Sequence, residues 1–383
     1  MRLLHCSDLH IGKRVNGFSM LEDQRHILAQ ILAVAVREAA DAILIAGDIY
    51  DKTIPSAEAV ELFDWFLTRL TEQGKPVFFL SGNHDSPERL DYASRILQNQ
   101  QVYIAGSYRG TALTHTLSDE YGPVHVHLVP FLKPGIVNGA LQTHCESYQE
   151  AMEEVLRELP VRPDERNILV AHQFITAGGV SPEQSDSELI SLGGVDQIDV
   201  SVFDGFDYVA LGHIHGPQRI GRDTVRYSGS PLKYSFSECR HQKSVCLVEL
   251  REKGIVSVRL IPMHPLRDMR KIRGRLEELL SEEVAALADR NDYLHVTLTD
   301  EDTILDAIGK LRRVYPNVMQ LEFENKRSQD SEEYGFFTQE AVEERSMDSL
   351  FSEFYQNQNN RPMDEAQKQF LEQCIRQIGE VER

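Results

Sequence analysis

The chain has 383 residues, of which 41% are hydrophobic, enough for a large core and unlike an intrinsically disordered protein. A formal net charge of −20 argues against a protein that binds a polyanion through its overall charge, because phosphate contacts use lysine and arginine. Five scattered cysteines without a CxxC pair argue against a disulfide framework or a cysteine zinc site. With no apolar run of membrane-spanning length, we expect a cytoplasmic protein of at least two domains.

The first 266 residues alternate short apolar strands with amphipathic helices. A capping box that starts at Ser19 predicts a helix to about residue 40, and the pattern over residues 56–73 predicts a second helix that ends before Gly74. Early strand–helix–strand units followed by consecutive strands predict an α/β core with mixed sheets. The predicted strands are residues 2–6, 42–46, 76–80, 125–129, 168–171, 208–211, 225–228, 244–250 and 255–261.

The composition changes near residue 267, where five basic side chains fall within nine residues. The segment that follows predicts a small α+β domain, with strands at 271–276, 293–298 and 318–324 and helices at 277–288 and 302–314. After it comes an acidic linker, and then two short helices at 347–355 and 363–378. We therefore divide the chain into domains at 1–266 and 267–326, a linker at 327–346 and a helical pair at 347–383.

Side chains of metal-ligand type follow five predicted strands of the first domain. In α/β sheets, ligands bind outside the carboxyl ends of the strands, where the connecting loops converge. We therefore expect these side chains to meet on one rim of the domain. They are Asp8 and His10, Asp48, Asn83 and His84, His172, and His213 and His215.

The types of these residues indicate which ions they would bind. Imidazole and carboxylate groups without thiolate suit Mn²⁺, Fe²⁺ or Zn²⁺. Seven nitrogen and oxygen ligands from this set of eight, with one carboxylate shared, are too many for one ion and fit two, which together could activate water and hold a phosphoryl group. Any single one of the 14 histidines is more often structural than a ligand, but this ordered set after successive strands is hard to obtain by chance.

The motifs SDLHIGKRV, AGDIYDKTIPS, LSGNHDSPERL, FDYVALGHIHGPQ and YSGSPLKYSFSE resemble those of the calcineurin-like metallophosphoesterases. Within that superfamily the chain is similar to the nuclease subunits of the SbcCD family, which act in DNA repair, recombination and replication. The resemblance covers residues 1–240 by motif and the remainder by layout. It implies a four-layer α/β/β/α sandwich, two ions that are preferably Mn²⁺, and exonuclease and endonuclease action on DNA, including hairpin cleavage.

The same resemblance implies a role for each site residue. His84 would protonate the leaving group or stabilise its charge. Asp85 would orient His84 from behind, or would instead cap the following helix. One ion would be held by Asp8, His10, Asp48 and His215. The other would be held by Asp48, Asn83, His172 and His213, with Asp48 bridging the two.

For the rest of the chain, the resemblance implies a DNA-capping domain and a pair of helices that dock on the coiled coil of an SbcC-type ATPase, within a heterotetramer built on a homodimer. The alternatives are an ordinary solvated surface for the basic residues and a self-packed hairpin for the two helices. The candidate DNA contacts are Arg270, Lys271, Arg273, Lys310 and Arg312. The candidate docking residues are Leu350, Phe351, Phe354 and Phe370.

Three other functions are compatible with parts of the pattern. A phosphoesterase for phosphoproteins or small phosphate esters would share every metal ligand. A scaffold that kept the fold would have little need for His84, and a DNA-end-binding module would hold purely structural metals. The negative charge is compatible with a nuclease if bound ions neutralise the carboxylates and the ATPase supplies positive charge; this is a hypothesis.

Overall fold

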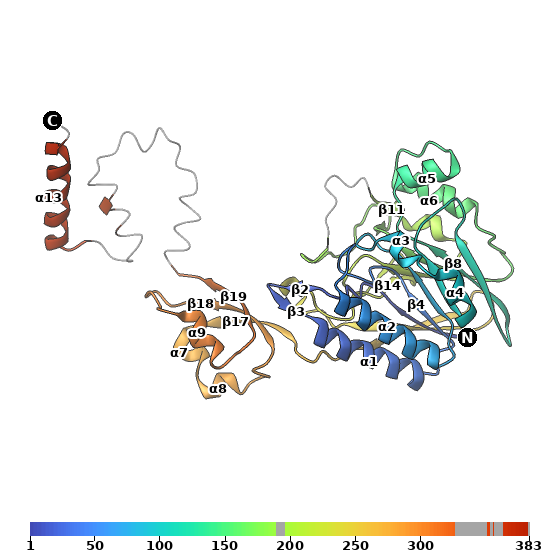
Figure 1. The fold of residues 1–383 in the computed structure, drawn as a ribbon, viewed down its shortest axis with the longest axis horizontal. Helices are drawn as coiled ribbons and strands as arrows, with labels where there is room; N and C mark the ends of the chain where they lie inside the picture. The colour runs from blue at the N-terminus through green and yellow to red at the C-terminus, as the bar shows by residue number, and fades with distance from the viewer. Residues whose placement is uncertain (189–195, 326–350, 353–354, 356–362, 382–383) are drawn as a thin grey trace. The chain divides into compact units, whose positions relative to one another are not determined.

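The computed structural model describes residues 1–188, 196–325, 351–352, 355 and 363–381 (Figure 1). The chain divides into two compact units, Met1–Asp268 and Met269–Arg383. None of the helices in these described segments combines the length and apolar character that a membrane crossing requires.

The first unit contains a six-stranded mixed sheet whose parallel strands include β1, β4, β5 and β6. Two further strands, β15 and β16, extend the sheet antiparallel from the β1 edge. The β4 and β5 segments, AILI and VFFL, are buried at every residue, as expected for strands covered on both faces. The order is β16 (Val256–Pro262), β15 (Ser244–Leu250), β1 (Arg2–Cys6), β4 (Ala42–Ile45), β5 (Val77–Leu80) and β6 (Val102–Ala105).

A second six-stranded sheet has four parallel strands at its centre and an antiparallel strand at each edge. Its order is β13 (Gln218–Ile220), β14 (Arg222–Tyr227), β12 (Tyr208–Gly212), β9 (Arg166–His172), β8 (Gly122–Val129) and β7 (Leu113–Asp119). Two short pairs lie outside the large sheets: β2 (Arg14–Val15) with β3 (Phe18–Ser19), and β10 (Ile175–Thr176) with β11 (Ile198–Asp199).

The two sheets face each other across a shared apolar core, to which Leu44 and Phe78 contribute from one sheet and Val126 and Val170 from the other. Figure 1 shows α1 and α2 together on one side of this unit and α5 and α6 on the opposite side. The expected α/β/β/α sandwich is therefore confirmed. The helices are α1 (Leu21–Arg37), α2 (Ala57–Glu72), α3 (Pro87–Leu90), α4 (Ser94–Leu97), α5 (Pro134–Leu141) and α6 (Tyr148–Arg157).

The start of α1 differs from the capping box expected at Ser19. Ser19 ends β3 and pairs with Arg14 in a short hairpin, so its backbone is held in a strand. Met20 occupies the N-cap position and makes no side-chain capping bond. The start of α2 agrees with the helix expected over residues 56–73. Here the Ser56 hydroxyl caps the helix by accepting a hydrogen bond from the Ala59 N–H at 3.3 Å.

The last residues of the first unit are tied to α1 and to a nearby loop. Arg267 forms ion pairs with Glu22 and Asp23 on the first turn of α1, the second at 2.7 Å. Lys233 Nζ lies 2.7 Å from an Asp268 carboxylate oxygen. Arg267, although part of the basic run in the sequence, is thus engaged in contacts within its own unit.

The second unit contains a three-stranded parallel sheet, ordered β17 (Met269–Gly274), β18 (Tyr293–Leu298) and β19 (Val318–Phe323). The helices expected at 277–288 and 302–314 are shorter in the structure, because side-chain caps begin new helices inside these ranges. Ser281 caps α8 and Asp306 caps α9 through their side-chain oxygens. The helices are α7 (Leu276–Leu279), α8 (Glu282–Ala285), α9 (Ala307–Arg312) and α13 (Glu365–Val381).

The core between the sheets predicts a large stability cost for Leu44→Ala, because Leu44 is fully buried there. The full chain should lose about 2–5 kcal/mol of unfolding free energy. Urea unfolding followed by the fluorescence of Trp65, the single tryptophan, would measure the loss in the first unit. Leu260→Ala is the matched control, because Leu260 is 41% exposed and should cost less than about 1 kcal/mol. Equal losses in both variants would contradict this packing.

Candidate metal centre

The expected ligand residues lie at the carboxyl ends of parallel strands from both large sheets. Three groups of side chains have ligand atoms that all lie within 4.8 Å of one another. The groups overlap, so they describe one site rather than three. They are Asp8 with His10 and His215, His10 with Asp48 and His84, and Asp8 with Asp48 and His172.

Within this site, two sets of donor atoms converge on different points. His10 Nε2 lies 3.1 Å from His215 Nε2. Asn83 Oδ1 lies 3.0 Å from both His172 Nε2 and His213 Nδ1. The two sets are adjacent, because they share a carboxylate.

That shared carboxylate belongs to Asp48, which follows β4 and is 2% exposed. Its Oδ2 atom lies 3.5 Å from His10 Nε2 and 3.4 Å from His172 Nε2, one residue from each set. Its Oδ1 atom accepts a hydrogen bond from the His84 backbone N–H at 2.9 Å. Asp48 therefore stands between the two sets.

Four site residues have backbone conformations that non-glycine residues rarely adopt. The φ angles are 53° at Asp8, 44° at His10, 50° at Asp48 and 110° at His213. Such conformations cost roughly 1–3 kcal/mol each and persist only where surrounding contacts enforce them. Here the enforcing contacts include the His10 N–H to the Asp48 carbonyl at 3.0 Å and the His213 N–H to Asp8 Oδ1 at 3.0 Å.

Two glycines allow the loops to approach this closely. A Cβ atom on Gly82 would lie 2.0 Å from Asp48 Oδ1 and 2.5 Å from the Asp48 backbone nitrogen. A Cβ atom on Gly212 would lie 1.9 Å from the Ala46 carbonyl oxygen, where the second sheet meets the first. Any larger residue at either position must displace the loop after β4.

The pKa directions reflect buried charges in close contact. Burial opposes ionisation of Asp48, but the charges of His172, His10 and His84 hold its pKa well below the ordinary value. Burial also opposes the charging of His172, yet the Asp48 carboxylate raises the His172 pKa to about 9. For Asp8 burial dominates and raises the pKa. The site thus holds buried carboxylates that need nearby positive charge.

These features fit divalent ions. The donor set consists of imidazole nitrogens and carboxylate and amide oxygens, which suits borderline-hard cations such as Mn²⁺. The His10 Nδ1 atom is buried and makes no hydrogen bond within the described part of the chain. His172 Nδ1 donates to the Ala46 carbonyl oxygen at 2.8 Å, so Nε2 is the nitrogen that would lose its proton and bind an ion.

The His84 ring lies at the edge of the site. Its Nδ1 atom is 3.1 Å from the Asp51 carbonyl oxygen. Because a carbonyl can only accept, this bond requires the proton on Nδ1 and leaves Nε2 available. The ring meets the His10 ring edge-on, with 4.8 Å between centroids.

The Asp85 carboxylate joins two loops. It accepts hydrogen bonds from the backbone N–H groups of Ile49 at 3.1 Å, Tyr50 at 2.9 Å and Gly82 at 2.9 Å. These bonds connect the loop after β4 to the loop after β5. The catalytic role expected for Asp85 from the sequence stays a prediction.

Two further residues hold the loop that carries His10, and sequence analysis did not identify them as site residues. Gln24 on α1 donates to the His10 carbonyl at 2.7 Å and accepts from the Gly12 N–H at 2.9 Å. The Tyr234 hydroxyl donates to the Leu9 carbonyl. A glutamine in a helical turn carries no local signal of such a role, which only the fold creates.

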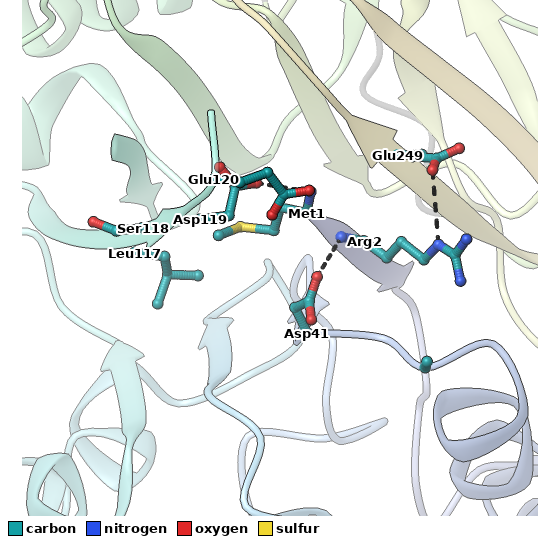
Figure 2. Close-up of a pocket in the computed structure, with 9 residues that line it drawn as sticks. Met1, Arg2, Asp41, Leu117, Ser118, Asp119, Glu120 and Glu249 are labelled. Carbon is teal, nitrogen blue, oxygen red and sulfur yellow. Dashed lines mark hydrogen bonds and ion pairs between the residues drawn. The ribbon is translucent and has the colours of Figure 1, made fainter. Parts of the chain in front are cut away.

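A cavity of about 460 Å³ lies at the amino-terminal end of β1 (Figure 2), whereas the candidate site follows the carboxyl end of that strand. Several carboxylates line it, and those of Asp41, Asp119 and Glu249 already have partners. The Asp41 carboxylate accepts from the Arg2 N–H at 2.7 Å, and Asp119 pairs with Arg166. We therefore do not assign this cavity to the metal centre.

The candidate DNA contacts divide into paired and unpaired side chains. Arg270 pairs with Asp292 and Arg273 with Glu324, at 2.6 and 2.8 Å. Arg312 donates to the Val318 carbonyl oxygen at 2.9 Å. Lys271 and Lys310 are exposed and form no ion pair with the described residues.

Of the candidate docking residues, Phe351 is 47% exposed and Phe370, on α13, is 69% exposed. Leu350 and Phe354 lie outside the described residues. The docking role of all four stays a prediction.

Comparison with known proteins gives matches to both parts of the chain. The family model for calcineurin-like phosphoesterases matches residues 1–217, and the model described as the type 5 capsule protein repressor C-terminal domain matches residues 265–359. The D subunit of the nuclease SbcCD from Staphylococcus epidermidis is 32% identical over 380 residues, which cover 98% of this chain and 98% of that protein.

Two solved structures are similar at lower identity. The protein TT1561 of Thermus thermophilus is 17% identical with a TM-score of 0.41, and the match covers 68% of this chain and 98% of that one. A dimetal phosphatase from Danio rerio is 14% identical with a TM-score of 0.41, and the match covers 68% of this chain and 95% of that one.

The close approach at Gly82 predicts that Gly82→Ala disrupts ion binding, because the added methyl group would overlap Asp48. Calorimetric titration with Mn²⁺ should give at least about tenfold weaker binding, the size of loss seen when support of a ligand is removed. Gly205→Ala is the matched control, since a Cβ there would meet no described atom within 4 Å. Unchanged binding in Gly82→Ala would show that Asp48 is not a ligand.

Proposed function

This chain belongs to the calcineurin-like phosphoesterase family, and we propose that it is a two-metal phosphodiesterase that cleaves DNA as the nuclease subunit of an ATPase-coupled complex. The observation that carries the proposal is the pair of donor sets on either side of Asp48, with His84 beside them. The near full-length similarity to a nuclease subunit supports DNA as the substrate over other phosphate esters.

In this proposal, the two donor sets hold two Mn²⁺ ions with Asp48 as the shared ligand. The bound ions would supply Lewis-acid activation of the phosphate and of water. One ion would be bound by Asp8, His10, Asp48 and His215. The other would be bound by Asp48, Asn83, His172 and His213.

His84 would act on the leaving group. The Asp51 carbonyl accepts its Nδ1 proton, so Nε2 is the ring nitrogen that would face the reacting phosphate. A protonated Nε2 would donate to the departing oxygen as the phosphodiester bond breaks. Asp85 would contribute indirectly, because its three bonds to backbone N–H groups fix the loops that carry Asp48 and His84.

DNA would also contact the second unit. Lys271 and Lys310 are the strongest candidates, since both are exposed and without an ion pair among the described residues. Arg270 and Arg273 are neutralised by Asp292 and Glu324, which makes them weaker candidates. Much of the positive charge that DNA needs would therefore come from bound ions and from the partner.

The proposed partner is an SbcC-type ATPase with a coiled coil, and exposed Phe370 on α13 supports docking of this helix against another chain. A homodimer of this chain within a heterotetramer is proposed from the same resemblance. Tyr92 and Ile96, which are 84% and 70% exposed, offer apolar surface for such contacts. Buried free cysteines such as Cys6 and Cys246 support a reducing, cytoplasmic location.

The proposal predicts that the full chain, with Mn²⁺ and with the SbcC-type ATPase and ATP present, hydrolyses end-labelled linear duplex DNA. His84→Gln should lower the rate by about 10²-fold or more, because the leaving oxygen loses its proton donor. A chelator should abolish cleavage by both proteins. Gel analysis of the labelled products over time would measure the rates.

His144→Gln is the matched control, because the His144 side chain is 87% exposed and lies outside the site. Cleavage that persists in His84→Gln would contradict the role of His84. Turnover of a phosphomonoester without DNA cleavage would favour the alternative, a phosphoesterase for a different phosphate ester.

The capping-domain contacts predict a change in the salt dependence of DNA binding. Replacing Lys271 and Lys310 with alanine should reduce the slope of log K against log salt by about 1 for each lysine. Fluorescence anisotropy in the His84→Gln background would measure binding without hydrolysis. Lys253→Ala is the control, because it removes the same charge from a lysine paired with Asp207 in the first unit. Equal slopes in the double variant and the parent would contradict DNA contact at these lysines.

A further inference from the structure

Behind His215, a chain of polar side chains leads away from the metal centre. His215 Nδ1 lies 2.6 Å from Ser187 Oγ. The Ser187 hydroxyl donates to Glu238 Oε1, and the other Glu238 oxygen accepts from Lys243 Nζ at 2.5 Å. Sequence analysis noted the motif that contains Glu238 but gave this residue no role.

The donors and acceptors in this row of hydrogen-bonded side chains can be assigned in one way when His215 Nε2 is free to bind an ion. The Nδ1 atom then carries the proton and donates to Ser187 Oγ. Ser187 in turn must donate to the Glu238 carboxylate, which can only accept. Lys243, which can only donate, completes the chain at the second carboxylate oxygen.

The same residues also fix the backbone of His215. Lys243 Nζ donates to the His215 carbonyl oxygen at 2.8 Å and to Ser230 Oγ at 2.9 Å. The His215 N–H donates to Glu188 Oε1 at 2.7 Å. Both the ring and the main chain of this one ligand are therefore held by polar groups, of which Glu188, Glu238 and Lys243 are buried.

Burying these charged groups costs free energy, which suggests that they serve a function other than stabilising the fold. The Glu238 side chain is fully buried and Lys243 is 5% exposed. An ion pair at such depth commonly stabilises a fold no more than well-packed apolar residues would. Glu238 Oε1 is also 3.7 Å from His215 Nδ1, too far for a direct hydrogen bond, so Ser187 is needed to connect them.

We propose that Ser187, Glu238 and Lys243 are positioning residues that hold His215 with Nε2 unprotonated and directed at one of the two ions. This inference rests on the proposed two-metal function. It adds that the two ions are supported unequally: the one that His215 would bind depends on this chain of side chains. The ion assigned to Asn83, His172 and His213 does not.

The test is an Mn²⁺ titration of the full chain, with free Mn²⁺ followed by electron paramagnetic resonance. Wild type should bind two ions. Ser187→Ala and Glu238→Gln should each weaken one of the two by about 10–100-fold and leave the other within about twofold. Ser187→Thr keeps a hydroxyl and should recover most of the affinity. The matched control is Ser235→Ala, whose hydroxyl contacts Ser237 on the exposed surface and should change neither ion.

The inference is overturned if wild type binds two ions and Ser187→Ala binds both as tightly. It is also overturned if both ions weaken equally and the melting temperature of the metal-free variant falls, because that pattern indicates general destabilisation. Binding of fewer than two ions by wild type would overturn the proposed two-metal function, and this inference with it.

Discussion

The structure of the site depends on the buried carboxylate of Asp48. A carboxylate at this depth is stable as an anion only when positive charge and hydrogen-bond donors surround it. Two imidazoles, from His10 and His172, approach one oxygen from opposite donor sets, and the His84 N–H binds the other. Each of these partners follows or ends a different strand. The need to compensate one charge therefore brings together loops that are far apart in the chain.

Bringing these loops together around Asp48 requires backbone conformations that non-glycine residues rarely adopt. The turns after β1, β4 and β12 place Asp8, Asp48 and His213 at positive φ, and the loops pass so closely that Gly82 and Gly212 have no room for a side chain. Rigid surroundings hold this strain in place: the sandwich core lies on one side, and bonds from side chains such as Gln24 and Asp85 hold the loops on the other. The result is a preorganised set of donors, which is what a two-ion centre requires.

Much of this arrangement was predictable from the sequence, and the limits have physical causes. Strand ends carry ligand-type residues in a fixed order, so the gathering of side chains such as Asp48 on one rim followed from the rule that ligands bind at the carboxyl ends of strands. Local patterns failed where tertiary contacts decide, as at Ser19, which is held in a hairpin instead of capping α1. The contact between Ser187 and His215 could not be predicted from the sequence either, because the fold brings together two residues that are 28 positions apart. For Asp85, either predicted role was reasonable locally, and only the fold shows that the carboxylate binds two loops.

The central claim is that two ions occupy the site with Asp48 between them. Anomalous diffraction at the manganese edge, from crystals of this chain grown with Mn²⁺, tests it most directly. The account predicts two peaks about 3.5–4 Å apart. One peak should contact His10 and His215, the other Asn83, His172 and His213, and both should contact Asp48. A single peak, or two peaks that do not share Asp48, would contradict it.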